Sequence, residues 1–333
     1  MEDGSLPVES ERRVVDGDTP FVSIVIPLWN EDESLPHLKP AIDEVLEREA
    51  LDAELIFVND GSRDGSFDQL EQFKAEDPRV HVIHFRRNQG KSAALSAGFE
   101  EARGRLVVTM DADLQDDPNE IPNLIKRLDD GYDMVSGWKK KRHDPISKTL
   151  PSKFFNGVAR MTSGIKIHDF NCGLKIYRRE VVETFELYGE LHRFIPILAK
   201  SQGFTVGELA VQHHPRRWGK TKFGLSRFLH GFLDLLTVLF LVKYAARPMH
   251  LFGAFGLVSG FVGFGILALL TIQWYMGQPI GDRPLFFLGI LLLIVGVQFF
   301  SMGLLGEQIN HMRQKTERIE RLKRQTRQLP PAE

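Results

Sequence analysis

The chain has 333 residues and a formal net charge of -2 at pH 7, which allows one large domain or two medium ones and gives no global positive charge for nucleic acid. Its one cysteine, Cys172, cannot form an intrachain disulfide, and the polar start from Met1 to Thr19 lacks the apolar core of a signal peptide. Both observations argue against a secreted protein, so we expect the bulk of the chain to face a reducing compartment.

After residues 1–19, which we expect to be disordered, short apolar runs rich in β-branched residues alternate with helical patterns. The predicted strands are Val22–Leu28, Leu55–Asn59, Val80–Phe85, Leu106–Met110 and Asp133–Gly137. The predicted helices between them are Ser34–Arg48, Phe67–Ala75, Ser92–Ala102 and Asn119–Leu128. This alternation predicts an α/β fold with a mostly parallel sheet covered on both faces, whose ligands gather beyond the carboxyl ends of the strands.

Polar clusters follow the first three predicted strands. The first two are Pro27-Leu28-Trp29-Asn30-Glu31 and the segment from Asn59 to Ser66. Asp60 could accept a hydrogen bond from a ring N–H of uracil or guanine, and Trp29 could offer a flat face to the base. Taken alone, Asp60-Gly61-Ser62 is better explained as an Asx turn that caps the next helix. The third cluster, Asn88-Gln89-Gly90-Lys91-Ser92, either binds phosphate at a helix start or only caps that helix.

The strongest motif is Asp111-Ala112-Asp113-Leu114-Gln115, at the end of the fourth predicted strand. Strand alternation would send Asp111 and Asp113 to the same side, and two carboxylates with an amide oxygen suit Mg²⁺ or Mn²⁺. Such an ion could hold a diphosphate and neutralise the charge on it. An isolated Asp-x-Asp is weak evidence, and Asp116-Asp117-Pro118 can be a simple helix start. The position after an apolar strand of a parallel sheet favours the metal site.

Residues 139 to 222 form a mixed region, with strands predicted near Asn171–Tyr177 and Phe204–Val211, that would complete one side of the site. We expect Cys172 to be a small buried side chain and His213-His214 to pack at a strand end rather than bind metal. The run from Arg216 to Lys222 is basic and would attract anionic lipid whatever its specific role.

The C-terminal third is apolar. Residues 223–247 are predicted to form an amphipathic helix in the membrane plane, because a polar stripe recurs at Arg227, His230, Asp234 and Thr237; a third crossing is the alternative. Residues 248–307 hold two predicted spans, about 249–275 and 285–306, each long enough to cross a hydrocarbon core of ~30 Å. Buried helices of a soluble protein are the alternative to this membrane hairpin.

Basic residues flank the predicted hairpin on its two outer ends. Lys243 and Arg247 precede it, and the tail of residues 308–333 carries Arg313, Lys315, Arg318, Arg321, Lys323, Arg324 and Arg327. The connecting loop has only Asp282 and Arg283. The positive-inside rule therefore predicts an integral membrane protein whose large N-terminal part and tail are cytoplasmic. We expect the membrane to be the plasma (inner) membrane.

In this order and combination the motifs resemble those of the family 2 inverting glycosyltransferases, most closely the dolichol-phosphate mannose synthase-like, polyisoprenyl-phosphate branch. The resemblance runs from about Phe21 to the end of the chain. Its carriers are Val25-Ile26-Pro27-Leu28-Trp29-Asn30-Glu31, Val58-Asn59-Asp60-Gly61-Ser62, Asn88-Gln89-Gly90-Lys91, Asp111-Ala112-Asp113-Leu114-Gln115, Cys172-Gly173-Leu174-Lys175 and Arg216-Arg217-Trp218-Gly219-Lys220-Thr221-Lys222.

The resemblance implies a GT-A catalytic domain over residues 20–222 and a role for each matched residue. Those implied for the nucleotide sugar are Pro27, Trp29, Glu31, Val58, Asp60, Lys91, Asp111, Ala112, Lys139 and Lys175. Those implied for the acceptor phosphate are Arg216, Lys220, Thr221 and Lys222. Asp113 and Gln115 would hold the metal, and the catalytic set would be Asp111, Asp113, Arg216 and Lys222. Trp29, Thr221 and Lys139 stand where the branch usually has Tyr, Ser and Arg, so Arg142 is an alternative to Lys139.

The activity implied is transfer of a sugar from a nucleotide diphosphate to polyprenyl (undecaprenyl or dolichyl) phosphate with inversion, with a UDP-sugar such as UDP-glucose favoured over GDP-mannose. A phosphate monoester is largely dianionic at neutral pH and needs no protein base, so one in-line displacement suffices. One alternative is a polysaccharide synthase acting on a hydroxyl, but Gln212 and Trp218 are too far apart for its Gln-x-x-Arg-Trp motif. The other is an inactive membrane scaffold, against which the intact metal motif argues. The sugar, the base, the lipid length, the pathway and the oligomeric state are not predicted.

Overall fold

The computed structural model describes residues 19–140, 156–157, 159–160, 164–184, 187–215, 237, 240, 244, 247–280 and 283–327. Outside these ranges lie the predicted N-terminal tail, Arg142, the basic run from Arg216 to Lys222 and all but single residues of the predicted interfacial helix. The chain divides into two units, Met1–Val238 and Leu239–Glu333, which are described separately.

The first unit contains a seven-stranded sheet in the order β3-β2-β1-β4-β6-β5-β7. Parallel pairing joins β1 to β2 and β4, β2 to β3, and β5 to β7, whereas β6 is antiparallel to both of its neighbours. The mostly parallel sheet predicted from the sequence is therefore confirmed. The strands are β1 (Val22–Leu28), β2 (Ala53–Asn59), β3 (Val80–His84), β4 (Leu106–Thr109), β5 (Met134–Lys139), β6 (Lys175–Arg178) and β7 (Val206–Val211).

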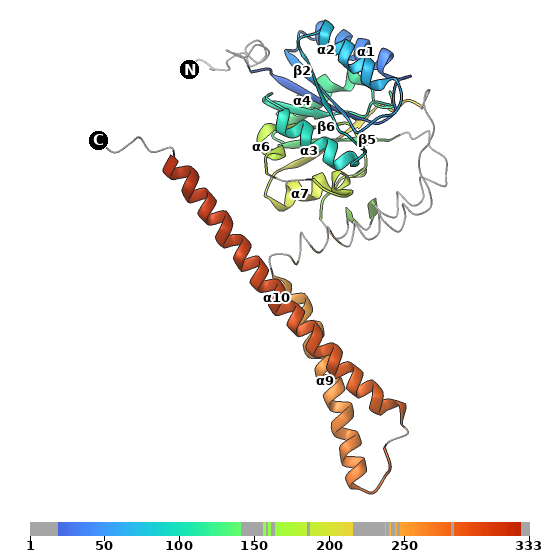
Figure 1. The fold of residues 1–333 in the computed structure, drawn as a ribbon, viewed down its shortest axis with the longest axis vertical. Helices are drawn as coiled ribbons and strands as arrows, with labels where there is room; N and C mark the ends of the chain where they lie inside the picture. The colour runs from blue at the N-terminus through green and yellow to red at the C-terminus, as the bar shows by residue number, and fades with distance from the viewer. Residues whose placement is uncertain are drawn as a thin grey trace, which may run out of the picture. The chain divides into compact units, whose positions relative to one another are not determined.

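Helices cover both faces of this sheet (Figure 1). On one face α1 buries Leu35, Leu38 and Ile42, which recur at helical spacing and join the core that includes Ile24 and Ile26 of β1. On the other face α3 lies so close to β1 that a Cβ on Gly98 would be 2.3 Å from Val25. The helices of this unit are α1 (Leu35–Arg48), α2 (Ser66–Glu76), α3 (Lys91–Glu101), α4 (Ile121–Asp129), α6 (Arg179–Val182) and α7 (Ile195–Ser201), with 3₁₀ turns η1 (Pro118–Glu120) and η2 (Leu191–Arg193).

The second unit is a hairpin of two helices, α9 (Pro248–Tyr275) and α10 (Pro284–Arg327), drawn in orange and red in Figure 1. Glycines let the two backbones approach closely: a Cβ on Gly256 would lie 2.8 Å from the carbonyl oxygen of Gly296. Pro248–Tyr275 and Pro284–Met312 are long and apolar enough to cross a membrane. The helix α10 continues to Arg327, beyond the predicted end of the second span at Gly306, because no Pro or Gly interrupts the chain there.

Candidate active site

The clusters that follow β1 and β2 lie together at the carboxyl edge of the sheet. The backbone N–H of Asn30 donates to Ser62 Oγ (2.9 Å), and the backbone N–H of Arg63 donates to Asn30 Oδ1 (2.8 Å). Asn30 has a positive φ of 54°, a conformation that Asn tolerates better than most residues. Two segments 32 residues apart are thereby joined into one surface, as expected for polar clusters that follow two parallel strands.

Asp60 links the second cluster to the third. Its carboxylate is buried and accepts the backbone N–H groups of Gln89 (2.6 Å) and Gly90 (2.9 Å) at the start of α3. Burial raises the pKa of Asp60, although the two N–H donors oppose that rise. Gly61 beside it has φ 68°, and a Cβ there would lie 2.5 Å from the backbone of Arg87, so only glycine fits. The carboxylate thus shapes the loop before Lys91.

The residues implied for the nucleoside differ in exposure. Trp29 is 37% exposed and Glu31 is half-buried, so both present side-chain surface at this edge. Val58 and Pro27 are buried within their strands. A contact of Val58 with a base through its side chain would therefore require movement, and its assignment, like the other nucleoside contacts, stays a prediction.

The carboxylate of Asp111 pairs with a lysine on one side and packs closely against a glycine on the other. Lys91 forms an ion pair with its Oδ1, and a Cβ on Gly173 would lie 2.5 Å from its Oδ2. Burial alone would raise the pKa of Asp111, but the charges of Lys91, Lys139 and Lys175 outweigh burial and hold that pKa below its usual range. Asp111 is therefore ionised at neutral pH, with about a third of its side chain (30%) still exposed.

Asp113 and Gln115 occupy the turn that follows β4. Leu114 between them has φ 58°, and Asp113 Oδ1 accepts the backbone N–H of Gln115 (3.2 Å). The amide nitrogen of Gln115 lies 3.5 Å from the carbonyl oxygen of His214, which turns its Oε1 away from that carbonyl. Within the described residues no group of three or more His, Cys, Asp or Glu side chains is placed to hold a metal. Two oxygen ligands nevertheless fit Mg²⁺ or Mn²⁺, because such ions take their other ligands from water and substrate phosphates.

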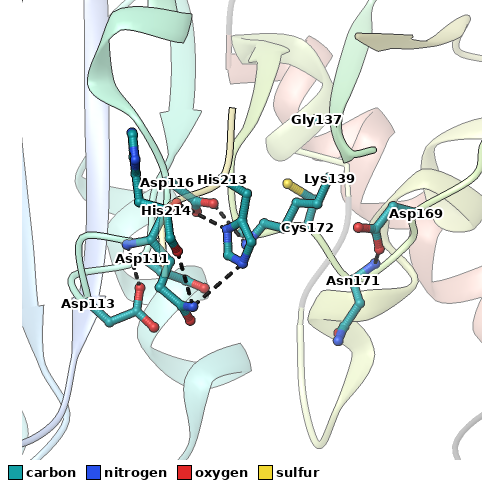
Figure 2. A network of polar contacts seen from close by, with 12 residues as sticks. Asp111, Asp113, Asp116, Gly137, Lys139, Asp169, Asn171, Cys172, His213 and His214 are labelled. Carbon is teal, nitrogen blue, oxygen red and sulfur yellow. Dashed lines mark hydrogen bonds and ion pairs between the residues drawn. The ribbon is translucent and has the colours of Figure 1, made fainter. Parts of the chain in front are cut away.

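His213 and His214, which follow β7, hold this turn in place by contacts that we call the clasp (Figure 2). The backbone N–H of His214 and Nδ1 of His213 both donate to the carbonyl of Gln115 (2.9 and 3.1 Å), and Asp116 pairs with His213 as an isolated β-bridge. His214 Nε2 lies 3.0 Å from Asp117 Oδ2. The two histidines do lie at a strand end, as predicted, but no sequence pattern indicated that they hold the 111–117 turn in place.

Lys139 forms a buried ion pair with Asp116 on the same turn (Figure 2). Its Nζ lies 2.9 Å from Asp116 Oδ1, and the two side chains are 13% and 0% exposed. Burial opposes the charged form of Lys139, but Asp116 and, more weakly, Asp111 raise its pKa above the ordinary value. Its predicted contact with a diphosphate is untested, and any such contact would have to share the ammonium with Asp116.

Lys175, at the start of β6, is buried, and its ammonium donates to the carbonyl of Cys172. Burial lowers the pKa of Lys175, and the neighbouring positive charge of Lys91 lowers it further. Cys172 is fully buried beside it, and burial raises the pKa of this thiol to about 12.

Comparison with known proteins places these features in a family. Residues 23–185 match the model of the family described as "Glycosyl transferase family 2". The dodecaprenyl-phosphate galacturonate synthase of Rhizobium johnstonii is 38% identical over 86% of this chain and 87% of its own length. The undecaprenyl-phosphate 4-deoxy-4-formamido-L-arabinose transferase of Shewanella sediminis is 37% identical over 88% of each chain.

The chain belongs to glycosyl transferase family 2. It is therefore a sugar-transferring enzyme, as the resemblance implied. The fold of this family 2 glycosyltransferase is shared by glucosyl-3-phosphoglycerate synthase from Mycobacterium tuberculosis, solved with Mn²⁺ and UDP-glucose, at 17% identity and a TM-score of 0.52 over 67% of this chain and 79% of that one. The predicted GT-A class is confirmed.

The structure brings together most, but not all, of the residues assigned from the sequence. The turn that carries Asp111, Asp113 and Gln115 lies beside Lys91 and Lys139, joined by the ion pairs described above. The residues assigned to the acceptor phosphate (Arg216, Lys220, Thr221 and Lys222) lie outside the described part of this family 2 glycosyltransferase. Arg216 follows His214 by two positions, so the chain enters the basic run directly from the clasp.

Proposed function

We propose that this enzyme transfers a glycosyl group from a nucleotide diphosphate sugar to the phosphate of a polyprenyl lipid, with inversion at the anomeric carbon. Two curated relatives that match most of the chain carry names of this type, with dodecaprenyl and undecaprenyl phosphate as the lipid. The observation that carries the proposal is the clasp between the 111–117 turn and His213-His214. It ties the candidate metal ligands to the segment from which the basic run starts.

The donor would bind across the carboxyl edge of the sheet. Trp29, Glu31 and Asp60 would surround the base, Asp111 and Ala112 would contact the ribose or the sugar, and Asp113 and Gln115 would hold Mg²⁺ or Mn²⁺. A bound divalent ion would supply charge neutralisation for the departing diphosphate. Mn²⁺ with UDP-glucose, the combination named for the mycobacterial synthase, is the first donor and ion to test.

The acceptor would need no general base from the protein. A phosphate monoester has a second pKa of about 6 and is mostly dianionic at neutral pH. The work left to the enzyme is to bring two anions together in line, which requires cations around both. Lys91 would serve at the donor side, and Arg216, Lys220 and Lys222 would serve at the acceptor side.

The second unit would anchor the enzyme in the membrane. Pro248–Tyr275 and Pro284–Met312 pass the length and composition required of spanning helices. With the basic residues at both outer ends of the hairpin, the catalytic unit and the C-terminus would lie in the cytoplasm. The acceptor phosphate would then meet the enzyme at the headgroup level of the inner leaflet.

A donor screen tests the proposal. The full chain, purified in detergent, is incubated with UDP- and GDP-sugars, undecaprenyl phosphate and Mg²⁺ or Mn²⁺, and the lipid is analysed by mass spectrometry. We expect a lipid product heavier by one glycosyl unit, and we expect no such product to form when EDTA is present. Transfer to a saccharide hydroxyl alone would support a polysaccharide synthase instead, and metal-independent nucleotide binding without transfer would support a scaffold.

The variant Asp113→Asn tests the proposed metal ligand in the same assay. Loss of the carboxylate should weaken metal-dependent binding of UDP or GDP and lower kcat by at least roughly 100-fold, the scale seen when one stabilising group of a transition state is removed. Asp68→Asn, on the exposed surface of α2, is the matched control. Activity of Asp113→Asn equal to that of the control would reject Asp113 as a metal ligand.

A further inference from the structure

A small pocket next to Asp111 is unusually rich in hydrogen-bond donors. Lys91, Lys175, His192, Arg193 and Asn171 line it, from the start of α3, β6, η2 and the loop before β6. Its volume is about 10 Å³, which is room for about one water-sized group. This space can take one oxygen atom of a ligand but not a whole phosphate group.

The cations around the pocket differ in how closely they are paired. Lys91 is paired with Asp111, and Arg193 Nη2 lies 2.5 Å from Glu190 Oε2. Lys175 is 4% exposed and donates to a carbonyl; within the described part of the chain no carboxylate forms an ion pair with it, although Asp169 and Asp111 favour its charged form from farther away. A negatively charged ligand group beside Lys175 would supply the close anionic partner that this buried amine lacks.

His192 adds a neutral donor. Ser92 Oγ accepts the backbone N–H of His192 (3.1 Å) and lies 3.0 Å from its Nδ1. When the Ser92 hydroxyl donates to Nδ1, the ring proton of neutral His192 is on Nε2. Burial and the charges of Lys91 and Arg193 hold the pKa of His192 well below its ordinary value, so the ring is neutral at pH 7.

Arg193 supplies a further donor. The side chain is almost wholly buried, and its Nε has no hydrogen-bond acceptor among the residues that the structure describes. A buried guanidinium N–H without an acceptor is unfavourable unless a ligand or water completes it. The pocket therefore offers the amine of Lys175, which has no close carboxylate partner among the described residues, and N–H donors from two neighbouring residues of η2.

We propose that this pocket receives a carboxylate on the donor sugar, so that the preferred donor is a nucleotide-activated hexuronate. This rests on the proposed function, which places Asp111 at the donor sugar. One oxygen atom of a carboxylate fits the pocket, and its charge distinguishes the carboxylate from the hydroxymethyl group of a neutral hexose, which would give Lys175 no close anionic partner. Of the sugars named for the curated relatives, galacturonate belongs to this acidic class and 4-deoxy-4-formamido-L-arabinose does not.

Matched pairs of donors test the inference. UDP-glucuronate is compared with UDP-glucose, and UDP-galacturonate with UDP-galactose, using the full chain in detergent with Mn²⁺ and undecaprenyl phosphate. In at least one pair we expect kcat/KM for the uronate to exceed that for its hexose by roughly tenfold or more, the value of one charge-assisted hydrogen bond. Equal use of the hexoses, or a preference for them, overturns the inference while upholding lipid glycosylation. No lipid product from any nucleotide sugar overturns both.

Lys175→Met tests the pocket itself. Removing the buried charge should reduce the uronate-to-hexose ratio of kcat/KM by roughly tenfold. Lys200→Met, at an exposed position of α7, is the matched control and should leave the ratio unchanged. Should Lys175→Met fail to fold, Arg193→Gln is measured in its place. A fall in activity that is equal for both members of a pair would show a purely structural role and overturn the assignment.

Discussion

Lys139 and Asp116 form the most enclosed ion pair at the candidate active site, and neither residue faces solvent to a large extent. Asp116 directly follows Gln115 in the chain and is bridged to His213, so the ion pair with Lys139 adds an attachment of the turn to β5 beside the His213-His214 contacts. We therefore assign Lys139 a positioning role, in addition to the predicted contact with the diphosphate. Removing only one partner leaves the other charge buried and unpaired, and the resulting loss of folding free energy is large enough to measure.

Asp116→Asn should destabilise the enzyme by about 3–5 kcal/mol, because it leaves the charge of Lys139 buried and uncompensated. Lys139→Met should be similarly harmful, while the double variant should lose much less than the sum of the two. Thermal unfolding in detergent, read as a double-mutant cycle, measures the coupling. Additive losses would show that the pair has no energetic coupling, and unchanged metal-dependent nucleotide affinity in Lys139→Met would refute positioning of the turn.

Glu54 on β2 predicts a pH dependence that is independent of the active site. Its buried carboxylate accepts Ser23 Oγ (2.6 Å) and the backbone N–H of Arg103 (2.7 Å), and pairs with the Arg103 guanidinium. Burial would raise the pKa of Glu54, but these donors outweigh burial and lower it. Because the folded pKa is the lower one, the stabilisation is present above the unfolded value of about 4.3 and is lost as pH falls toward the folded value.

Glu54→Gln should therefore lower stability by about 1–3 kcal/mol at pH 7, with the deficit shrinking as pH drops below about 4.3. Chemical or thermal unfolding at pH 7 and pH 4 measures the two differences. Glu76→Gln, at an exposed position, is the control and should show little change at either pH. A deficit that grows on acidification would contradict the sign of the shift.

At the scale of the elements, sequence periodicity predicted the strands and helices of the first half closely. Val22–Leu28 was predicted with its observed bounds, because the run is β-branched, buried throughout and closed by a polar cluster. Near Asn171 a strand was predicted, but pairing starts only at Lys175. The antiparallel direction of β6 was not predicted, because the alternation of residues in a strand is the same for either direction.

The local motifs of the site were visible in the sequence, whereas its long-range contacts were not. The spacing within Asp111-Ala112-Asp113-Leu114-Gln115 pointed to a metal, since the residues are neighbours in the chain. The clasp on Gln115 joins residues almost 100 positions apart. Such contacts depend on the strand order, which no local pattern specifies.

Because glycines line the interface between α9 and α10, we expect the effect of a larger side chain on stability to depend strongly on its position. Gly296→Leu should separate the helices, because a Cβ at Gly296 already lies 2.8 Å from the backbone nitrogen of Gly260. In lipid the helices associate by close packing rather than by a hydrophobic driving force, so lost contact is not easily replaced. Gly265→Leu is the control, since nothing lies within 4 Å of a Cβ there.

The measurement is thermal stability of the full chain in detergent together with its yield in the membrane fraction. We expect Gly296→Leu to lower both and Gly265→Leu to leave both near the wild-type values. Equal effects of the two substitutions would show that the hairpin is held by something other than this close approach.

At the scale of the whole molecule, the length of α10 bears on the membrane proposal. Its 44 residues correspond to about 66 Å, roughly twice the thickness of a hydrocarbon core. Pro284–Met312 would fill the bilayer, and the remaining turns would continue beyond it on the side where the positive charges gather. The catalytic unit and this basic extension should therefore be accessible from the same side.

Trypsin applied to sealed membranes tests that arrangement. In right-side-out vesicles the catalytic unit and the C-terminus should be protected, and in inverted vesicles both should be digested, since each carries many Lys and Arg residues. Epitope tags at the two termini, detected with antibodies, show which end is digested. Digestion of one end from each side would mean an odd number of crossings and would contradict the two-helix hairpin.

The environment of Cys172 makes the native chain suitable for site-specific labelling. Alkylating reagents and oxidants attack the thiolate, and a thiol that is enclosed and held in its protonated form offers them almost none. Because it is the chain's single sulfhydryl, a cysteine introduced on the surface would carry a fluorophore or spin label without background. Distances between such labels could then be followed during turnover in the otherwise unaltered enzyme.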